Sequence, residues 1–465
     1  MLAASLGGMW VSAVDEKTLW AEASAHLQAG FADLPPAEGV ALDSRAAEVL
    51  WEVAERLRDN YPYFHPLYAG QMLKPPHPLA RLAYGLAQQI NPNNHALDGG
   101  RASSAMEKEA VAELAGLFGW QRHLGHLSSG GTFANLEALW VGGQLAPGKT
   151  VLASSQAHNT HSRIAQVLQL PFETVATDAA GRMDADALAA RLAQGNVGMV
   201  VATAGTTAMG AVDPVAEILQ LRDRFEFRLH VDAAYGGYFR LVDTLEPRTR
   251  RALAAISEAD SIVIDPHKHG LQPYGCGCVL FADPGVGRFF QHDSPYTYFT
   301  SDELHLGEIS LECSRAGASA VALWATQRLL PLVEGGEFAA GLAAGREAAL
   351  ELFGRLRGSN NWLIAWPPEL DIVCWAPAGG SASAISARTR AVFAAAARQD
   401  LHLAMVSFPS GTTNFARSKL LSSVALGSRS SRRIFPRGAS ALEIKYKELF
   451  GPKVAWTIWS SYPVS

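Results

Sequence analysis

The sequence predicts an α/β fold in which helices cover a large, mixed but mostly parallel sheet. Between residues 104 and 281, short apolar runs rich in β-branched residues alternate with segments of helical periodicity. Strands that alternate with helices in this way usually pair in parallel, because each helix crosses over the sheet to reach the next strand. The chain has 465 residues, of which 48% are hydrophobic and 18% charged, as is typical of a globular protein with a large core.

The apolar runs give the expected strands and the periodic segments give the expected helices. Strands are expected at 150–153, 174–176, 197–202, 229–231, 262–264 and 279–281. Helices are expected at 46–57, 106–118, 133–139, 162–170, 184–194 and 214–225. Asp184 is the expected N-cap of its helix. Residues 61–100 are rich in Pro, Asn, His and Gly, and that composition predicts a loop.

A smaller α+β pattern follows the large one. Residues 316–356 are rich in Ala and Leu and predict helices, and after them we expect a strand at 372–375, a helix at 384–398 and a strand at 403–407. We therefore expect an N-terminal helical and loop segment (1–100), a large domain (101–330), and linker helices with a small C-terminal domain (331–465).

Charge and cysteine content exclude several kinds of protein. The net charge of −5 gives no general attraction to nucleic acid or to an anionic membrane. Four cysteines are too few for a disulfide scaffold, and Cys276-Gly-Cys278 lacks the two-residue spacing of common zinc and redox sites, so no metal site is predicted. We find no stretch of 18 uncharged apolar residues and no basic leader, and we expect a cytoplasmic protein without a membrane span.

One lysine lies where α/β sheets place their chemistry. The expected strand 262–264 ends in Asp265-Pro266-His267-Lys268, and ligands of open α/β sheets bind at the carboxyl ends of strands. A lysine held there between apolar walls can lose its proton and attack a carbonyl, as a Schiff-base lysine must. A solvated lysine in a loop would give the same pattern.

Four other clusters stand at strand ends or helix starts. Residues 128–132 form a Gly-rich turn before a helix, which suits a phosphate or a plain helix cap. His158 follows a strand and can stack on a flat ring, although a lone histidine is more often structural. Residues 203–207 offer hydroxyls or a simple turn, and Asp232 can pair with a protonated ring nitrogen or cap a turn. Together with the lysine, these features fit one ligand, a phosphorylated pyridine aldehyde.

At this point the sequence resembles the group II amino acid decarboxylases that depend on pyridoxal 5′-phosphate (PLP), from about residue 60 to residue 330. The motifs that carry the resemblance are Ser129-Gly130-Gly131-Thr132, Ala157-His158, Thr203-Ala204-Gly205-Thr206-Thr207, His230-Val231-Asp232-Ala233-Ala234 and Asp265-Pro266-His267-Lys268. By this resemblance, Lys268 carries the cofactor as an internal aldimine, Asp232 binds the pyridine nitrogen, and His158 stacks on the ring and is also catalytic.

The resemblance implies further roles for residues around the cofactor. Gly131, Thr132 and His267 are expected to hold the phosphate, and Thr206 and Ala234 to lie against the cofactor. It also implies the type I PLP-dependent transferase fold, similar to that of aspartate aminotransferase, with a seven-stranded sheet, a small C-terminal domain and assembly into a homodimer. The tail from about residue 427 departs from the family pattern, because it is rich in Ser and Arg and carries two Trp within residues 454–465.

The function implied is α-decarboxylation of an L-amino acid to an amine and CO2 through a quinonoid intermediate. The pyridinium ring takes up the carbanion at Cα, and Asp232 keeps that ring protonated. Alternatives on the same scaffold are a carbon–carbon lyase, an aminotransferase and a non-catalytic PLP-binding protein. His269-Gly270 after the lysine, where aromatic decarboxylases usually have Trp, looks closer to sphingosine-1-phosphate lyase and archaeal tyrosine or aspartate decarboxylases.

Three further residues are candidates. The resemblance implies a proton-donating tyrosine on the segment between the lysine and Arg315, and we expect Tyr296 there, with Tyr298 as the alternative. Arg315 is expected either to bind a substrate carboxylate or to brace the site. His95, in the early polar segment, is a candidate substrate residue. The amino acid that serves as substrate is left open.

Overall fold

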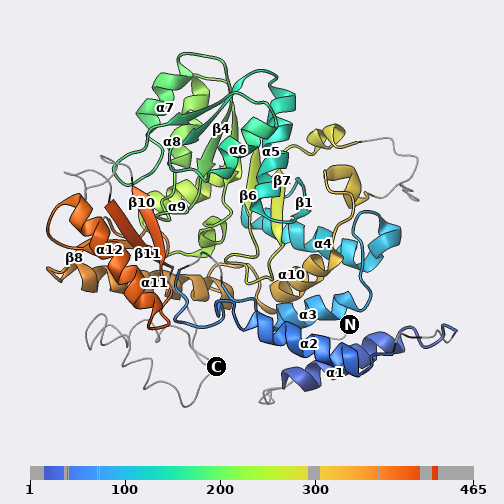
Figure 1. Ribbon diagram of the computed structural model, residues 1–465. Coiled ribbons are helices and arrows are strands. Elements are labelled where there is room, and N and C mark those ends of the chain that lie inside the picture. Colours follow the sequence, from blue (N-terminus) through green and yellow to red (C-terminus); the bar gives the residue numbers. More distant parts are fainter. Residues whose placement is uncertain are drawn as a thin grey trace.

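A computed structural model describes residues 15–35, 39, 41–70, 72, 74–291, 304–364, 366–408 and 421–427. The large sheet has seven strands in the order β1-β7-β6-β5-β4-β2-β3. It lies at the centre of the molecule (Figure 1). The strands are β1 (Leu124–Ser128), β2 (Thr150–Ser154), β3 (Phe172–Val175), β4 (Val197–Thr203), β5 (Arg228–Asp232), β6 (Ser261–Ile264) and β7 (Gly277–Phe281). Strands β2 to β6 pair in parallel, and β7 is antiparallel to both of its neighbours. The sheet is therefore mixed but mostly parallel, as expected.

Helices bury both faces of this sheet, which explains why its central strands read as continuous apolar runs. Successive side chains of β4 enter different parts of the core: Val200 lies in one cluster, and Val201 lies in another beside Leu139. Leu139 belongs to α5 (Gly131–Leu145), which also packs on β6 and β7. The other helices near the sheet are α4 (Leu97–Leu117), α6 (Thr160–Val167), α7 (Ala185–Leu192), α8 (Val215–Gln220), α9 (Pro247–Ala254) and α10 (Gly317–Leu329). Asp184 is the N-cap of α7, as predicted, and accepts hydrogen bonds from two backbone N–H groups.

A second, four-stranded sheet lies beside the first (Figure 1). Its order is β10-β11-β9-β8, and every pairing in it is antiparallel. Its strands are β8 (Trp362–Ile364), β9 (Ile372–Pro377), β10 (Ala404–Phe408) and β11 (Leu421–Gly427), and its helices are α11 (Glu337–Arg357) and α12 (Ala382–Ala397). The smaller α+β pattern is thus present, although β8 and β11 were not predicted. The limits of the domains stay predictions.

Two sequence interpretations were wrong. Residues 61–100 are not all loop, because α3 (Pro78–Gln88) lies within them and buries three alanines. Its start is favourable, since Pro78 occupies the first turn and the His77 ring accepts the Leu79 N–H. Strand β1 was missed because His126 interrupts its apolar run, but that imidazole is buried against the Glu137 carboxylate at 2.6 Å.

The N-terminal helices lie at one end of the molecule (Figure 1). They are α1 (Glu16–Ala29) and α2 (Ser44–Leu57), and neither buries a residue. Four side chains at helical spacing on α2 (Val49, Leu50, Val53 and Leu57) are apolar and exposed. Among the residues that the structure describes, no helix is long and apolar enough to cross a membrane.

Candidate functional site

A cavity of about 450 Å³ opens at the carboxyl ends of the parallel strands. Its size suits a small-molecule ligand. Polar side chains from the ends of β2, β4, β5 and β6 and from the start of α5 line it, together with an apolar wall. The lining residues are Met72, Ser129, Gly130, Gly131, Thr132, Phe133, Asn135, Leu136, His158, Thr160, Thr203, Gly205, Thr207, Asp232, Ala234, Tyr235, Asp265, His267, Lys268 and Tyr274.

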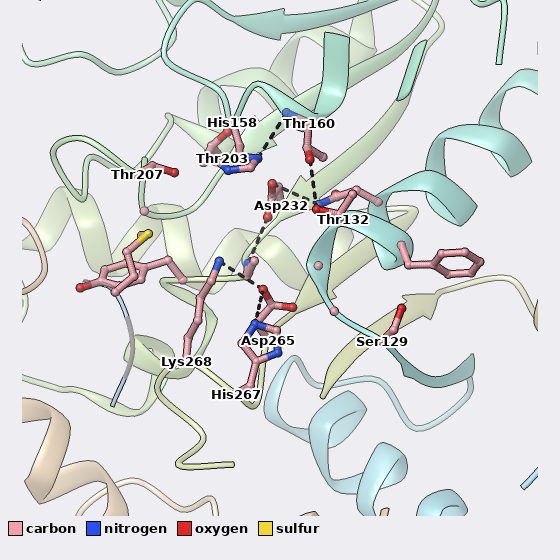
Figure 2. A pocket seen from close by; sticks show the side chains of 18 of the residues that line it. Ser129, Thr132, His158, Thr160, Thr203, Thr207, Asp232, Asp265, His267 and Lys268 are labelled. Carbon is pink, nitrogen blue, oxygen red and sulfur yellow. Dashed lines mark hydrogen bonds and ion pairs between the residues drawn. The ribbon is translucent and has the colours of Figure 1, made fainter. Parts of the chain in front are cut away.

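Lys268 is held beside Asp265 immediately after β6. The Lys268 N–H donates to the Asp265 carbonyl (2.9 Å), which closes a tight turn, and its Nζ lies 3.1 Å from Asp265 Oδ2. Figure 2 shows the side chains of Lys268, Asp265 and Asp232 pointing into the same space. The His267 ring lies on the other side of Asp265, with Nε2 3.5 Å from Oδ2. The turn therefore presents an amine, a carboxylate and an imidazole to one cavity.

The Gly-rich turn brings the N-terminus of α5 to the same cavity. Gly130 has a φ of 147°, a backbone conformation that side chains rarely allow. A Cβ on Gly131 would lie 2.6 Å from Asp265 Oδ2, so only glycine permits this approach. Thr132 follows with its hydroxyl 3.2 Å from that of Thr160. Backbone N–H groups in the first turn of a helix have no intrahelical partner, and they suit an anion.

Asp232 is the last residue of β5, and its carboxylate accepts hydrogen bonds from three donors. The Ala234 N–H donates to Oδ1 (3.1 Å), and Oδ2 accepts from His161 Nε2 (2.9 Å) and Asn135 Nδ2 (3.3 Å). Burial would raise the pKa of Asp232, but the hydrogen bond and charge of His161 and the charge of Lys268 outweigh it and hold that pKa well below its usual range. Asp232 is therefore a carboxylate that can hold a positive charge inside the cavity.

His158 lines the cavity after β2 as a neutral imidazole. The Thr160 N–H donates to its Nδ1 (3.3 Å), so the ring proton resides on Nε2. Desolvation lowers the pKa of His158, and the nearby Asp232 carboxylate opposes that shift only in part. Burial likewise lowers the pKa of His267. Two uncharged rings thus accompany the Lys268 amine.

The hydroxyl turn after β4 places its threonines differently from one another. Thr206 is fully buried and does not line the cavity, because its hydroxyl accepts the Ala211 N–H (3.1 Å) inside the turn. Thr203 and Thr207 line the cavity instead. Thr203 Oγ1 is buried without a hydrogen-bond partner in the protein, so this hydroxyl is able to bond a ligand in the cavity.

Arg315 and His95 are not among the residues that line this cavity. The Arg315 guanidinium is buried, pairs with the Glu107 carboxylate and donates to the Leu127 carbonyl. His95 lies beside the segment that begins at residue 304, since its carbonyl accepts the Gly307 N–H (2.9 Å). Tyr296 and its alternative Tyr298 lie outside the described residues.

Other residues of the site were not recognised in the sequence. Asn135 and His161 contact Asp232. Asn135 lies on α5 four residues after Gly131, and this helical spacing is the signal that could have found it. His161 lies near the start of α6, three residues after His158. Tyr274 lines the cavity and stacks on His267, with ring centroids 4.9 Å apart. In the described ranges, no group of three or more His, Cys, Asp or Glu side chains could hold a metal ion.

A further cluster joins the second sheet to the site. Asp371 precedes β9, and its carboxylate accepts hydrogen bonds from the Tyr235 hydroxyl (2.5 Å), His269 Nε2 (3.2 Å) and Lys74 Nζ (3.3 Å). His269 directly follows Lys268, and its Nδ1 faces the Tyr235 carbonyl at 2.9 Å. The carboxylate that directly precedes β9 of the second sheet thereby holds the segments that follow Lys268 and Asp232.

The arrangement suits a ligand with an anionic group, a basic ring nitrogen and an electrophilic carbon. A helix N-terminus can take the anion, a buried carboxylate can take the protonated nitrogen, and a primary amine can attack the carbon. Two other buried atoms without partners, Asp265 Oδ1 and His267 Nδ1, belong to side chains that line the cavity. The donors and acceptors present therefore fit a phosphorylated pyridine aldehyde.

Comparison with known proteins identifies a matching family model and relatives that are named as decarboxylases. A family model described as the pyridoxal-dependent decarboxylase conserved domain matches residues 143–374. A probable L-aspartate decarboxylase of Halobacterium salinarum is 32% identical over 264 residues, which cover 56% of this chain and 70% of that protein. The L-tyrosine decarboxylase of Enterococcus faecium is 31% identical over 386 residues, which cover 61% of this chain and 63% of that protein. The chain thus spans less than two thirds of the length of this second relative.

Solved structures share the fold. The crystal structure of Oryza sativa TDC with PLP and tryptamine matches with a TM-score of 0.71 at 16% sequence identity, covering 90% of this chain and 95% of that one. Identity this low shows the fold alone. The expected type I fold is confirmed.

Proposed function

The chain belongs to the pyridoxal-dependent decarboxylase family, and from this premise we propose that it binds PLP and converts an L-amino acid to an amine and CO2. The observation that carries the proposal is that the Lys268 amine and the ionised Asp232 carboxylate line one cavity beside the N-terminus of α5. Relatives named as tyrosine or aspartate decarboxylases support the same chemistry.

The residues of the cavity divide the binding of the cofactor among them in this proposal. The Lys268 amine holds the aldehyde carbon, Asp232 the ring nitrogen, and Gly131 and Thr132 the phosphate at the start of α5. His267 completes the phosphate site through an imidazole whose Nδ1 has no protein partner. The cofactor, when bound, supplies a pyridinium ring that accepts the electron pair released when the bond between Cα and the carboxylate breaks.

The remaining side chains orient the cofactor ring and control the protonation of its nitrogen. Asp232 keeps a proton on the ring nitrogen, because the carboxylate itself stays ionised inside the protein. His158 offers a neutral ring to the cavity and can stack without adding charge. Ala234 leaves room for a flat ring, and Thr203 offers its unpaired hydroxyl. We keep Tyr296 as the proposed proton donor.

Substitution of Lys268 and a substrate panel test this proposal. Purified protein incubated with PLP and then reduced with borohydride should keep the cofactor after denaturation, whereas Lys268→Ala should lose it, because only an imine to the lysine is reduced to a covalent bond. Release of CO2 should be measured over aromatic, acidic and diamino L-amino acids. Covalent retention of the cofactor in reduced Lys268→Ala would overturn the assignment of the lysine. Formation of a keto acid or aldehyde without CO2 would favour an aminotransferase or a carbon–carbon lyase.

We also propose that the protein is a homodimer and that α2 contributes to its interface. Val49, Leu50, Val53 and Leu57 are exposed apolar side chains at helical spacing on α2, and exposed apolar patches can mark contacts between proteins. Light scattering should give the mass of two chains, and Val53→Glu should shift the protein toward one chain. A monomeric wild-type protein would refute the proposal.

A further inference from the structure

His161 lies behind the wall of the cavity and makes the shortest side-chain hydrogen bond to Asp232. Its Nε2 lies 2.9 Å from Asp232 Oδ2, and the imidazole has no exposed surface. It lies on α6, three residues after His158, but it does not line the cavity. Anything that it does for a bound ligand is therefore done through Asp232.

A second hydrogen-bonded chain reaches the same oxygen. Asn135 Nδ2 lies 3.3 Å from Asp232 Oδ2, and Asn135 Oδ1 lies 2.8 Å from His230 Nε2. His230 Nδ1 lies 2.9 Å from Ser261 Oγ. All of these residues are buried.

The direction of each bond in this chain follows from chemistry. Burial lowers the pKa of His230 to about 3, so its imidazole is neutral and carries one proton. The Asn135 carbonyl oxygen can only accept, so that proton resides on Nε2, and His230 Nδ1 accepts from the Ser261 hydroxyl. The Asn135 amide is then oriented with its N–H group toward Asp232. The chain delivers a donor to Oδ2, as His161 does.

Packing alone does not explain a histidine at this position. Ile164 and Ala165 share the buried face of α6, and an apolar side chain at 161 would pack there without a polar atom to satisfy. The imidazole instead leaves Nδ1 buried without a hydrogen-bond partner, which costs free energy. The bond to Asp232 is what compensates for that loss.

We propose that His161 is a positioning residue that holds Asp232 as a carboxylate in one orientation, with Asn135 and His230 as a second support. Oδ2 is occupied by two protein donors, whereas Oδ1 accepts one backbone N–H and can accept a further proton donor from the cavity. The fixed carboxylate then meets the protonated ring nitrogen of the cofactor without having to rotate or take up a proton. This inference rests on the proposed function.

The test compares two substitutions of the same residue. His161→Leu removes the donor, and His161→Gln retains an N–H group at a similar reach. Loss of a hydrogen bond to a charged group should weaken PLP binding about 10- to 100-fold in His161→Leu, measured by fluorescence titration of the full-length chain. kcat should fall by a similar factor and KM should change less, because His161 does not reach the cavity. His161→Gln should recover most of the loss in both measurements.

A double-mutant cycle separates positioning from folding. If His161 acts through Asp232, His161→Leu should have no further effect on PLP affinity when Asp232 is already Asn. Equal loss of PLP affinity in the Leu and Gln variants, or an undiminished effect in the Asp232→Asn background, would overturn the inference. If the Leu variant does not fold, His161→Asn tests the same bond, because its amide is too short to reach Asp232. Failure of the wild-type protein to bind PLP would instead refute the proposed function.

Discussion

Replacement of Asp371 by Asn should destabilise the protein even though Asp371 does not line the cavity. The Asp371 side chain is 2% exposed, and its carboxylate accepts hydrogen bonds from Tyr235, His269 and Lys74. Burial would raise the pKa of Asp371, but the charges of Lys74 and His269 outweigh it and hold that pKa well below its usual range. The amide of Asn has the same shape but cannot balance the buried Lys74 ammonium.

The expected loss follows from the burial of the pair. Removing one partner of a buried ion pair costs about 3–5 kcal/mol, and the lower end applies because the Lys74 side chain remains 13% exposed. A chain of 465 residues has an unfolding entropy of about 1 kcal/mol per kelvin, so the melting temperature should fall by about 3 °C. Differential scanning calorimetry of the protein without added cofactor measures this shift.

The matched control is Glu109→Gln, which removes an ion pair with Arg328 that is about half exposed on both sides. It should leave the melting temperature within error of wild type, because exposed pairs contribute little. Equal shifts in the two variants would refute the reasoning, since the loss in Asp371→Asn would then owe nothing to burial. Lys74→Met should couple with Asp371→Asn, so that the double variant loses less than the sum of the two shifts.

Three other residues give predictions of the same kind. Burial raises the pKa of Asp213 to about 7, so the folded state holds a proton that the unfolded state releases near pH 4. The free energy of unfolding, measured in urea, should therefore fall by about 2–3 kcal/mol from pH 5 to pH 8. Asp213→Asn should remove that dependence on pH. Gly131→Ala should weaken PLP binding at least tenfold in a fluorescence titration, because its methyl group would collide with Asp265. Arg315→Met should cost about 3 kcal/mol or more in urea unfolding, because the buried Glu107 carboxylate loses its charged partner. A KM effect without loss of stability would indicate a substrate contact instead.

The sequence alone located the ends of the strands that form the cavity. Lys268, Asp232 and His158 each follow a short apolar run, and parallel strands bring their carboxyl ends to one edge of a sheet. That reasoning needs only local patterns, because burial on both faces makes each central strand a continuous apolar run. It fails where a polar residue is satisfied inside a strand, as His126 is in β1 by Glu137.

Only the tertiary structure decided which side chains support the reacting groups. His161 and Asp232 are 71 positions apart, and His269 and Asp371 are 102 positions apart. Their pairing depends on how α6 packs against β5 and on how the second sheet docks against the first, and no local pattern encodes either. The turn that contains Thr206 shows the same limit. The Thr206 hydroxyl bonds the backbone within the turn, whereas Thr203 and Thr207 line the cavity, and the sequence of the turn does not tell these threonines apart. Hydrogen bonds between distant segments form only once packing brings them together, so the partners of a motif cannot be read from the motif.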